Sequence, residues 1–156
     1  TKRINPRLQY YKANEILRND FYDGEWKIEQ CRRHTIFMSQ WGYPLKGFHL
    51  MLQALKEVAE CFSDVKLYIT GQNPFEAKGK ERWKQSYYVH YIMKLITEWE
   101  LREHIVFLGR ELNEEEMKKQ YLRANVFVLP SALENSSNST VSPLVIFLAA
   151  TLENVT

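Results

Sequence analysis

Short apolar runs and longer amphipathic stretches alternate along this chain. The apolar runs have the length of single strands and are bounded by glycine, proline or polar residues. This pattern is typical of strands buried on both faces of a parallel sheet. The runs are Thr35–Ser39, Val65–Gly71, Ile105–Gly109 and Val126–Leu129. The sequence therefore predicts four strands between residues 35 and 129.

Between these runs, apolar residues recur at the spacing of amphipathic helices. The spacing predicts helices over Phe48–Cys61, over Ser86–Glu100 and from Glu114 to Arg123, the last of which is capped by Asn113. Regular alternation of strand and helix indicates an α/β fold. We expect a Rossmann-like parallel sheet of about four to five strands with helices on both faces. The aromatic and aliphatic stripe of the second helix, which includes Tyr88 and Trp99, is more typical of core packing than of a ligand site.

Two further segments have weaker patterns. Trp26–Arg33 is compatible with a second short helix that precedes the first strand. Residues 72–85 are polar, contain Pro74 and Gly79, and are expected to form a long loop.

Composition narrows the class of protein. The 156 residues are 45% hydrophobic and 26% charged, which fits one domain with a substantial core. The net charge of +2 is too balanced to suggest nucleic acid as the main partner. Cys31 and Cys61 are the only cysteines and are far apart, so we expect two small buried hydrophobic residues and no metal site. The four histidines have no serine or cysteine partner that spacing indicates, so we interpret them as structural.

Candidate ligand groups follow the ends of the predicted strands. Parallel α/β sheets bind ligands at the carboxyl ends of their strands. Lys46 and Gly47 stand just before the first helix, where free N–H groups and a lysine suit a phosphate, although a solvated loop lysine is the alternative. Gly71 ends the second strand. The loop after the fourth strand offers small polar groups that suit sugar hydroxyls and phosphates, or else a solvated loop with a helix cap; its candidate residues are Ser131, Glu134, Asn135, Ser136, Asn138 and Ser139.

The segment from Val126 to Ser139 resembles the donor site of retaining family-4 glycosyltransferases, which are group 1 transferases with the two-domain GT-B fold. Their pattern is a strand, Pro-Ser, a Glu, seven residues and a second Glu. Pro130-Ser131 and Glu134 match the first part of this pattern. Lys46-Gly47 and Gly71 resemble the family's residues near the donor diphosphate and the nucleotide. The resemblance covers roughly residues 8–139.

The sequence departs from the family at two positions. Ser142 stands where the second Glu, which holds the ribose hydroxyls, is expected. Trp41 stands where an arginine commonly accompanies the lysine. In addition, Pro143–Ala150 is an unbroken apolar run with no counterpart in the family pattern.

The resemblance implies an enzyme that transfers a sugar from a nucleotide-sugar to an acceptor glycan or lipid, with this chain supplying donor binding. Glu134 would be the catalytic residue, and no metal or cofactor would be needed besides the donor substrate. The alternative is a non-catalytic remnant or interaction module that keeps the fold without donor binding.

The resemblance also implies a domain organisation. Residues 1–33 would lead in from an amino-terminal domain outside this chain, and residues 34–139 would form the nucleotide-sugar-binding domain. Residues 140–156 would be a divergent or aberrant tail, for which a frameshift or truncation is the alternative to true divergence. The acceptor would bind to the amino-terminal domain, so we expect the chain alone to be inactive. We also expect self-association through the apolar tail, and a cytoplasmic location, at the membrane face for a full-length protein.

Overall fold

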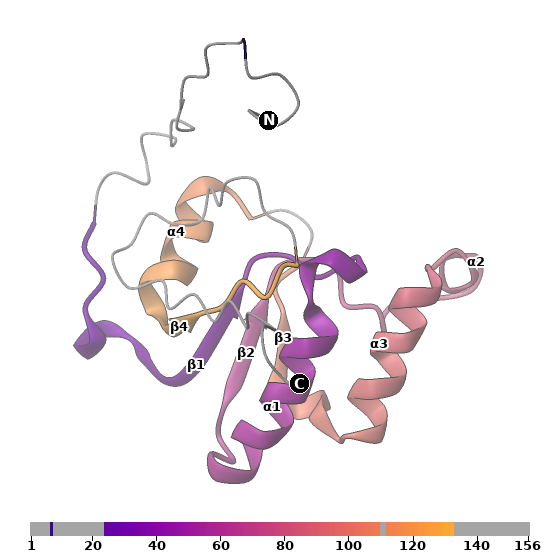
Figure 1. The fold of residues 1–156 in the computed structure, drawn as a ribbon, viewed down its shortest axis with the longest axis horizontal. Helices are drawn as coiled ribbons and strands as arrows, with labels where there is room; N and C mark the ends of the chain where they lie inside the picture. Colours follow the sequence, from indigo (N-terminus) through magenta and orange to yellow (C-terminus); the bar gives the residue numbers. More distant parts are fainter. Residues whose placement is uncertain (1–6, 8–23, 110–111, 133–156) are drawn as a thin grey trace.

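The computed structural model describes residue 7 and residues 24–109 and 112–132. Within them, four strands alternate with helices (Figure 1). The strands are β1 (Arg32–Met38), β2 (Lys66–Ile69), β3 (Ile105–Phe107) and β4 (Ala124–Phe127). The α-helices are α1 (Phe48–Cys61), α2 (Lys80–Trp83), α3 (Tyr87–Glu98) and α4 (Glu114–Arg123). Three 3-10 helices complete the list, η2 (Ile28–Gln30), η3 (Pro44–Lys46) and η4 (Leu101–His104).

The four strands form one parallel sheet in the order β3-β2-β1-β4. The chain moves outward from β1 through β2 to β3 and then returns to place β4 on the other side of β1 (Figure 1). The direction of winding thus reverses between β1 and β4, which makes the crevice beyond their carboxyl ends a topological switch point. The predicted α/β class, with a parallel Rossmann-like sheet, is confirmed.

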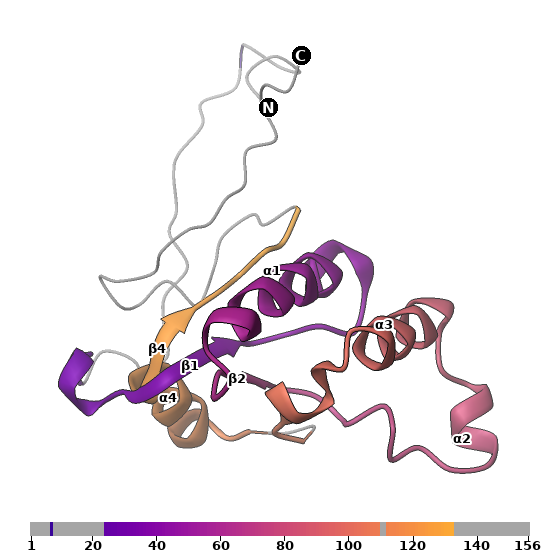
Figure 2. The same ribbon diagram turned by 90° about the horizontal axis from the view of Figure 1, so that it is seen from below.

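Helices cover both faces of the sheet (Figure 2). On one face, α1, α3 and η4 bury Phe48, Leu52 and Ile92 against the inward residues of β1 and β2. On the other face, α4 packs Met117 and Tyr121 against a smaller cluster that contains Phe37, Ala124 and Phe127. The stripe along α3 is core, as expected, since Ile92, Leu95 and Ile96 are all buried.

The pairing of β1 with β4 is irregular near its start. The register shifts between Arg32 and Ile36, and His34 has a φ of +52° inside this shift. Side chains replace the regular ladder there: Thr35 N–H donates to Asn125 Oδ1 at 3.1 Å, and Asn125 N–H donates to Thr35 Oγ1 at 3.2 Å. The buried Thr35 therefore has hydrogen-bond partners, and these bonds hold β1 and β4 in one register.

Helix ends follow local chemistry. The helix over Phe48–Cys61 has the predicted bounds. Ser86 caps α3 by accepting a hydrogen bond from Val89 N–H. Asn113 and Glu116 form a reciprocal capping box at the start of α4, with acidic residues in the first turn.

Three expectations are wrong in detail. The proposed helix over Trp26–Arg33 is only η2, because β1 already begins at Arg32. The polar stretch 72–85 contains the short helix α2. Neither cysteine is fully buried: Cys61 is exposed, and Cys31 is intermediate, with its Sγ 3.2 Å from the carbonyl oxygen of Ala124.

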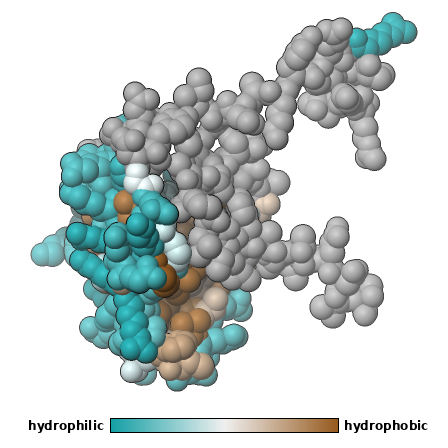
Figure 3. Space-filling view, turned by 90° about the vertical axis from the view of Figure 1, so that its left-hand side faces the viewer, coloured by the Kyte–Doolittle hydropathy of each residue, from teal (hydrophilic) through white to brown (hydrophobic). Residues whose placement is uncertain are grey.

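The surface on the side shown in Figure 3 is mainly hydrophilic where the described residues are visible, and its hydrophobic part is gathered toward the bottom of the view. Among the described residues, no helix is long and apolar enough to cross a membrane.

Candidate functional site

The loops that follow β1 and β4 meet at the switch point. Gly47 has a φ of +70°, in the left-handed region, and a Cβ added to it would overlap the carbonyl group of Pro130, 2.8 Å from the carbonyl carbon. Ala132 N–H donates to the carbonyl oxygen of Leu45 at 2.9 Å. Only glycine fits both the backbone angle and the close approach. Two candidate segments that are distant in the sequence are therefore adjacent in the fold.

Lys46 lies beside this junction. It is the last residue of η3 and directly precedes Gly47, the N-cap of α1. Its Nζ lies 5.9 Å from the centre of the Tyr43 ring. The first turn of α1 has no acidic residue and no side-chain cap. The positive end of the helix dipole and the lysine charge therefore act on the same region.

Ser131 lies on the opposite side of the junction. Its Oγ is buried and forms no hydrogen bond within residues 24–109 and 112–132. A buried hydroxyl without a partner is uncommon, which marks this position as one where a further polar group is expected. The other candidates of this loop, namely Glu134, Asn135, Ser136, Asn138 and Ser139, lie outside the described residues, as does Ser142.

Gly71 lies at the end of β2, away from this junction. Its φ is +115°, and its N–H donates to the carbonyl oxygen of Gly109 at 2.6 Å. A Cβ on Gly71 would lie 2.6 Å from Nε1 of Trp41. Trp41 is itself only 6% exposed, since it packs between Phe48 and Phe107 with ring centroids 5.5 Å apart in both cases. Trp41 is thus a core residue that requires glycine at position 71.

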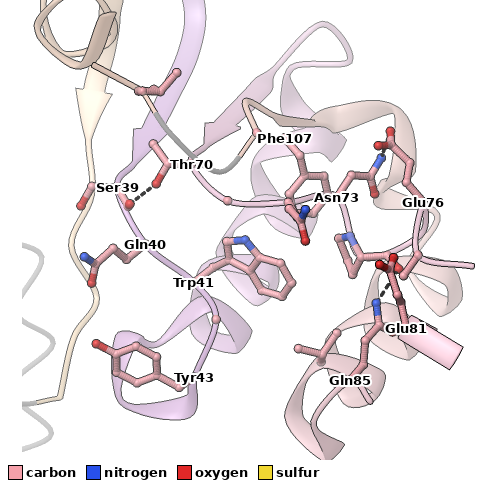
Figure 4. Close-up of a pocket in the computed structure, with 18 of the residues that line it drawn as sticks. Ser39, Gln40, Trp41, Tyr43, Thr70, Asn73, Glu76, Glu81, Gln85 and Phe107 are labelled. Carbon is pink, nitrogen blue, oxygen red and sulfur yellow. Dashed lines mark hydrogen bonds between the residues drawn. The ribbon is translucent and has the colours of Figure 1, made fainter. Parts of the chain in front are cut away.

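A cavity of about 1000 Å³ opens at the carboxyl ends of β1, β2 and β3 (Figure 4). The loop after β1 and the long segment after β2 supply most of its walls. Trp41 is one of the lining residues and lies with Tyr43 on one side and Phe107 and Asn73 on the other (Figure 4). Gly71 lines the cavity, whereas Lys46, Gly47 and Ser131 do not. The sequence candidates therefore separate into two neighbouring parts, the junction and the cavity.

The segment after β2 is held in place by several interactions. Asn73 accepts a hydrogen bond from Phe75 N–H at 3.1 Å and donates to Glu76 Oε1 at 2.9 Å. Gln85 Nε2 donates to the carbonyl oxygen of Pro74 at 2.8 Å, and Arg102 stacks 3.7 Å from the centre of the Phe75 ring. This wall is preformed by the chain itself.

Sequence reasoning missed these cavity residues. They lie in a stretch without the apolar periodicity of a helix or strand, whose pattern indicates only a loop. These residues are Asn73, Glu76, Glu81 and Gln85. The length and polarity of this stretch directly after a strand end were the available signal.

The histidines have structural partners, as expected. His34 Nδ1 lies 2.6 Å from Asp64 Oδ1, and this hydrogen bond is the main reason why the pKa of Asp64 is lowered. His49 contacts the hydroxyl of Tyr88, whose pKa is raised chiefly by burial. His90 and His104 each contact a backbone carbonyl oxygen. No group of three potential metal-ligating side chains occurs in the described part of the chain.

Comparisons with known proteins agree with the fold. The family model described as "Glycosyl transferases group 1" matches residues 24–139. The chain is similar to the C-terminal domain of a glycosyl transferase group 1 family protein (LpcC) from Francisella tularensis, with 16% identity and a TM-score of 0.55. The match covers 77% of this chain and 60% of that one.

A second similar structure is sucrose-phosphate synthase from Thermosynechococcus elongatus, at 22% identity and a TM-score of 0.49, covering 67% of this chain and 24% of that one. The chain thus spans about a quarter of the synthase. The sequence matches no curated protein.

Proposed function

Because the chain belongs to the group 1 glycosyltransferases, we propose that it carries the donor-binding part of an enzyme that transfers a sugar from a nucleotide-sugar to an acceptor. The observation that carries this proposal is the contact of Gly47 with Pro130 at the switch point, where α/β sheets bind their ligands. The proposal extends to a retaining, family-4 enzyme in which this chain is part of the carboxyl-terminal domain and an acceptor glycan or lipid is bound elsewhere.

The junction supplies the groups that a donor diphosphate needs. Lys46 provides a charge-assisted hydrogen bond, and the N-terminus of α1 provides a favourable dipole. The Ser131 hydroxyl is available to donate to an oxygen of the ligand. Glu134, which follows three residues later, would accept hydrogen bonds from the hydroxyls of the donor sugar.

Transfer would break the bond between the anomeric carbon of the sugar and the diphosphate oxygen and form a bond from that carbon to an acceptor hydroxyl oxygen, whose proton is released. The diphosphate leaves with an added negative charge. A positive group fixed in position before the reaction stabilises that charge without a further reorganisation cost. The left-handed turn at Gly47 and its contact with Pro130 hold the Lys46 loop in one place, which supports a junction preorganised for this role.

The test is a titration of the isotopically labelled chain with UDP and GDP, followed by amide chemical shifts. We expect the largest shifts at Lys46, Gly47 and Ser131. Shifts confined to the opposite end of the sheet, near Lys66 and Glu103, would contradict the proposal.

A second candidate function, an interaction module without donor binding, is favoured by Trp41. The arginine implied there by the family pattern is replaced by a core residue that is 6% exposed, so that position adds no charge to the junction. A chain that unfolds cooperatively and shows no shifts with either nucleotide would support this second function.

A further inference from the structure

The cavity at the ends of β1, β2 and β3 differs in charge from the neighbouring junction. Its described lining contains two charged side chains, Glu76 and Glu81, and both are acidic. Carboxylates in a cavity wall disfavour a bound phosphate and favour N–H and O–H donors. The part of a ligand that enters this cavity must therefore be uncharged and rich in donors.

The amides of the loop after β2 are partly used, although Gln85 Oε1 is buried and has no hydrogen-bond partner in the described part of the chain. Asn73 uses its Oδ1 for Phe75 N–H and its Nδ2 for Glu76, while Gln85 uses Nε2 for the carbonyl oxygen of Pro74. The carboxylates are different, because two oxygens accept about four hydrogen bonds. Glu76 has one such bond from Asn73, which orients its carboxylate while leaving most of its capacity open.

On the basis of the proposed function, we propose that this cavity holds the base of the donor nucleotide and selects guanine. Guanine presents two adjacent N–H donors, at N1 and at the 2-amino group, which one carboxylate can accept together in a charge-assisted pair. Uracil presents a single N–H between two carbonyl oxygens, and each of these is repelled by a carboxylate. Adenine places a ring acceptor beside its amino group, which meets the same repulsion.

The arrangement of the loop after β1 gives the nucleotide its direction. Tyr43 lines the cavity, and the Nζ of Lys46 lies 5.9 Å from the centre of the Tyr43 ring, outside the cavity. A base between the walls therefore has its phosphates directed past Tyr43 toward the lysine and the N-terminus of α1. The acidic cavity and the basic junction fit the two ends of one ligand.

The experiment is isothermal titration of the 156-residue chain with GDP, ADP and UDP. We expect GDP to bind about tenfold tighter or more than either competitor, which is the discrimination of one good bidentate pair. Glu76→Gln and Glu81→Gln identify the carboxylate: one of them should abolish the preference for GDP by weakening GDP binding. UDP affinity should stay the same or rise, because the repulsion of the uracil oxygens is removed. Glu60→Gln, an exposed change in the last turn of α1, is the control and should alter nothing.

The outcomes separate the two proposals. Equal affinities for the three nucleotides, or a preference for UDP, would overturn the guanine inference and leave donor binding supported. A preference for GDP that survives both glutamine variants would also overturn it. Absence of binding by all three nucleotides would overturn the donor-binding function together with this inference.

Discussion

The α-carbon of Gly47 lies against the carbonyl group of Pro130, with no room for a side chain between them. The first residue joins β1 to α1, and the second follows β4. A single close approach thus fixes the relative position of the two loops that form the proposed diphosphate site.

The first prediction is that Gly47→Ala destabilises the fold by about 2–4 kcal/mol, because the Cβ requires a strained left-handed backbone and displaces Pro130. Urea unfolding measures the change. Gly42→Ala is the matched control, since nothing lies within 4 Å of its Cβ, and it should change the free energy of unfolding by less than about 0.5 kcal/mol. Equal effects of both substitutions would show that the contact is not restrictive.

The second prediction concerns Lys46. Lys46→Gln should weaken nucleoside diphosphate binding by about tenfold or more, because hydrogen bonds to charged groups contribute about 1.5–3 kcal/mol. Lys94→Gln removes an exposed charge on α3 and serves as the control. If both lysine variants bind the nucleotide as the parent does, the diphosphate does not contact Lys46.

The third prediction concerns the start of α4. Asn113→Ala removes the acceptor for Glu116 N–H, a hydrogen bond of 2.8 Å, and should lower the free energy of unfolding by about 1 kcal/mol. Asn113→Asp keeps the acceptor and should retain the stability of the parent. If Asn113→Ala and Asn113→Asp unfold at the same denaturant concentration, this cap does not stabilise the fold.

The fourth prediction concerns the wall of the cavity. Arg102→Ala removes the stacking on Phe75, which contributes about 0.5–1 kcal/mol at an exposed site. Hydrogen exchange should accelerate at the amides of Phe75 and Glu76, whose bonds to Asn73 depend on the position of this loop. Arg102→Lys should give a smaller acceleration, because it keeps the charge and loses the planar contact. Unchanged exchange in Arg102→Ala would mean that the stacking on Phe75 does not help to hold this loop.

The fifth prediction concerns acid. The pKa of Asp64 is lowered from 3.8, first by its hydrogen bond with His34. A lowered pKa in the folded state means that the carboxylate stabilises the fold above the unfolded pKa, and that this contribution is lost as the pH falls below 3.8. The stability difference between the parent and Asp64→Asn should therefore be present at neutral pH and disappear in strong acid. A difference that persists unchanged at low pH would contradict this assignment.

The sequence predicts a helix or strand correctly where its local pattern of apolar residues matches the face that packs against the core. The helix Phe48–Cys61 has the expected bounds because a glycine in the left-handed region fixes its start and its apolar stripe faces one core. The fourth strand is displaced toward the amino terminus, to Ala124–Phe127, because pairing with Arg32 of β1 begins there. That displacement depends on a partner strand, which no local pattern contains.

The candidate site was predictable only in part. Lys46, Gly47 and Ser131 are candidates because they follow strand ends, and the structure places their loops together. Trp41 has no signal in sequence that distinguishes a loop aromatic from a core one; its burial depends on the absence of a side chain at Gly71. Glu76 and Glu81 contribute to the cavity through the path of a non-periodic loop, so their position follows from long-range contacts.

The order of strands has a consequence for biogenesis. Synthesis delivers β1, β2 and β3 first, and they can pair as they emerge. The bonds between Thr35 and Asn125 join positions 90 apart, so β4 can take its place only after nearly all of the described sheet has left the ribosome. The junction between the loops that follow β1 and β4 is thus the last feature to be shaped. If a nucleotide binds at this junction as proposed, it would recognise the completed sheet and not the nascent one, and its binding would report that the described sheet has folded.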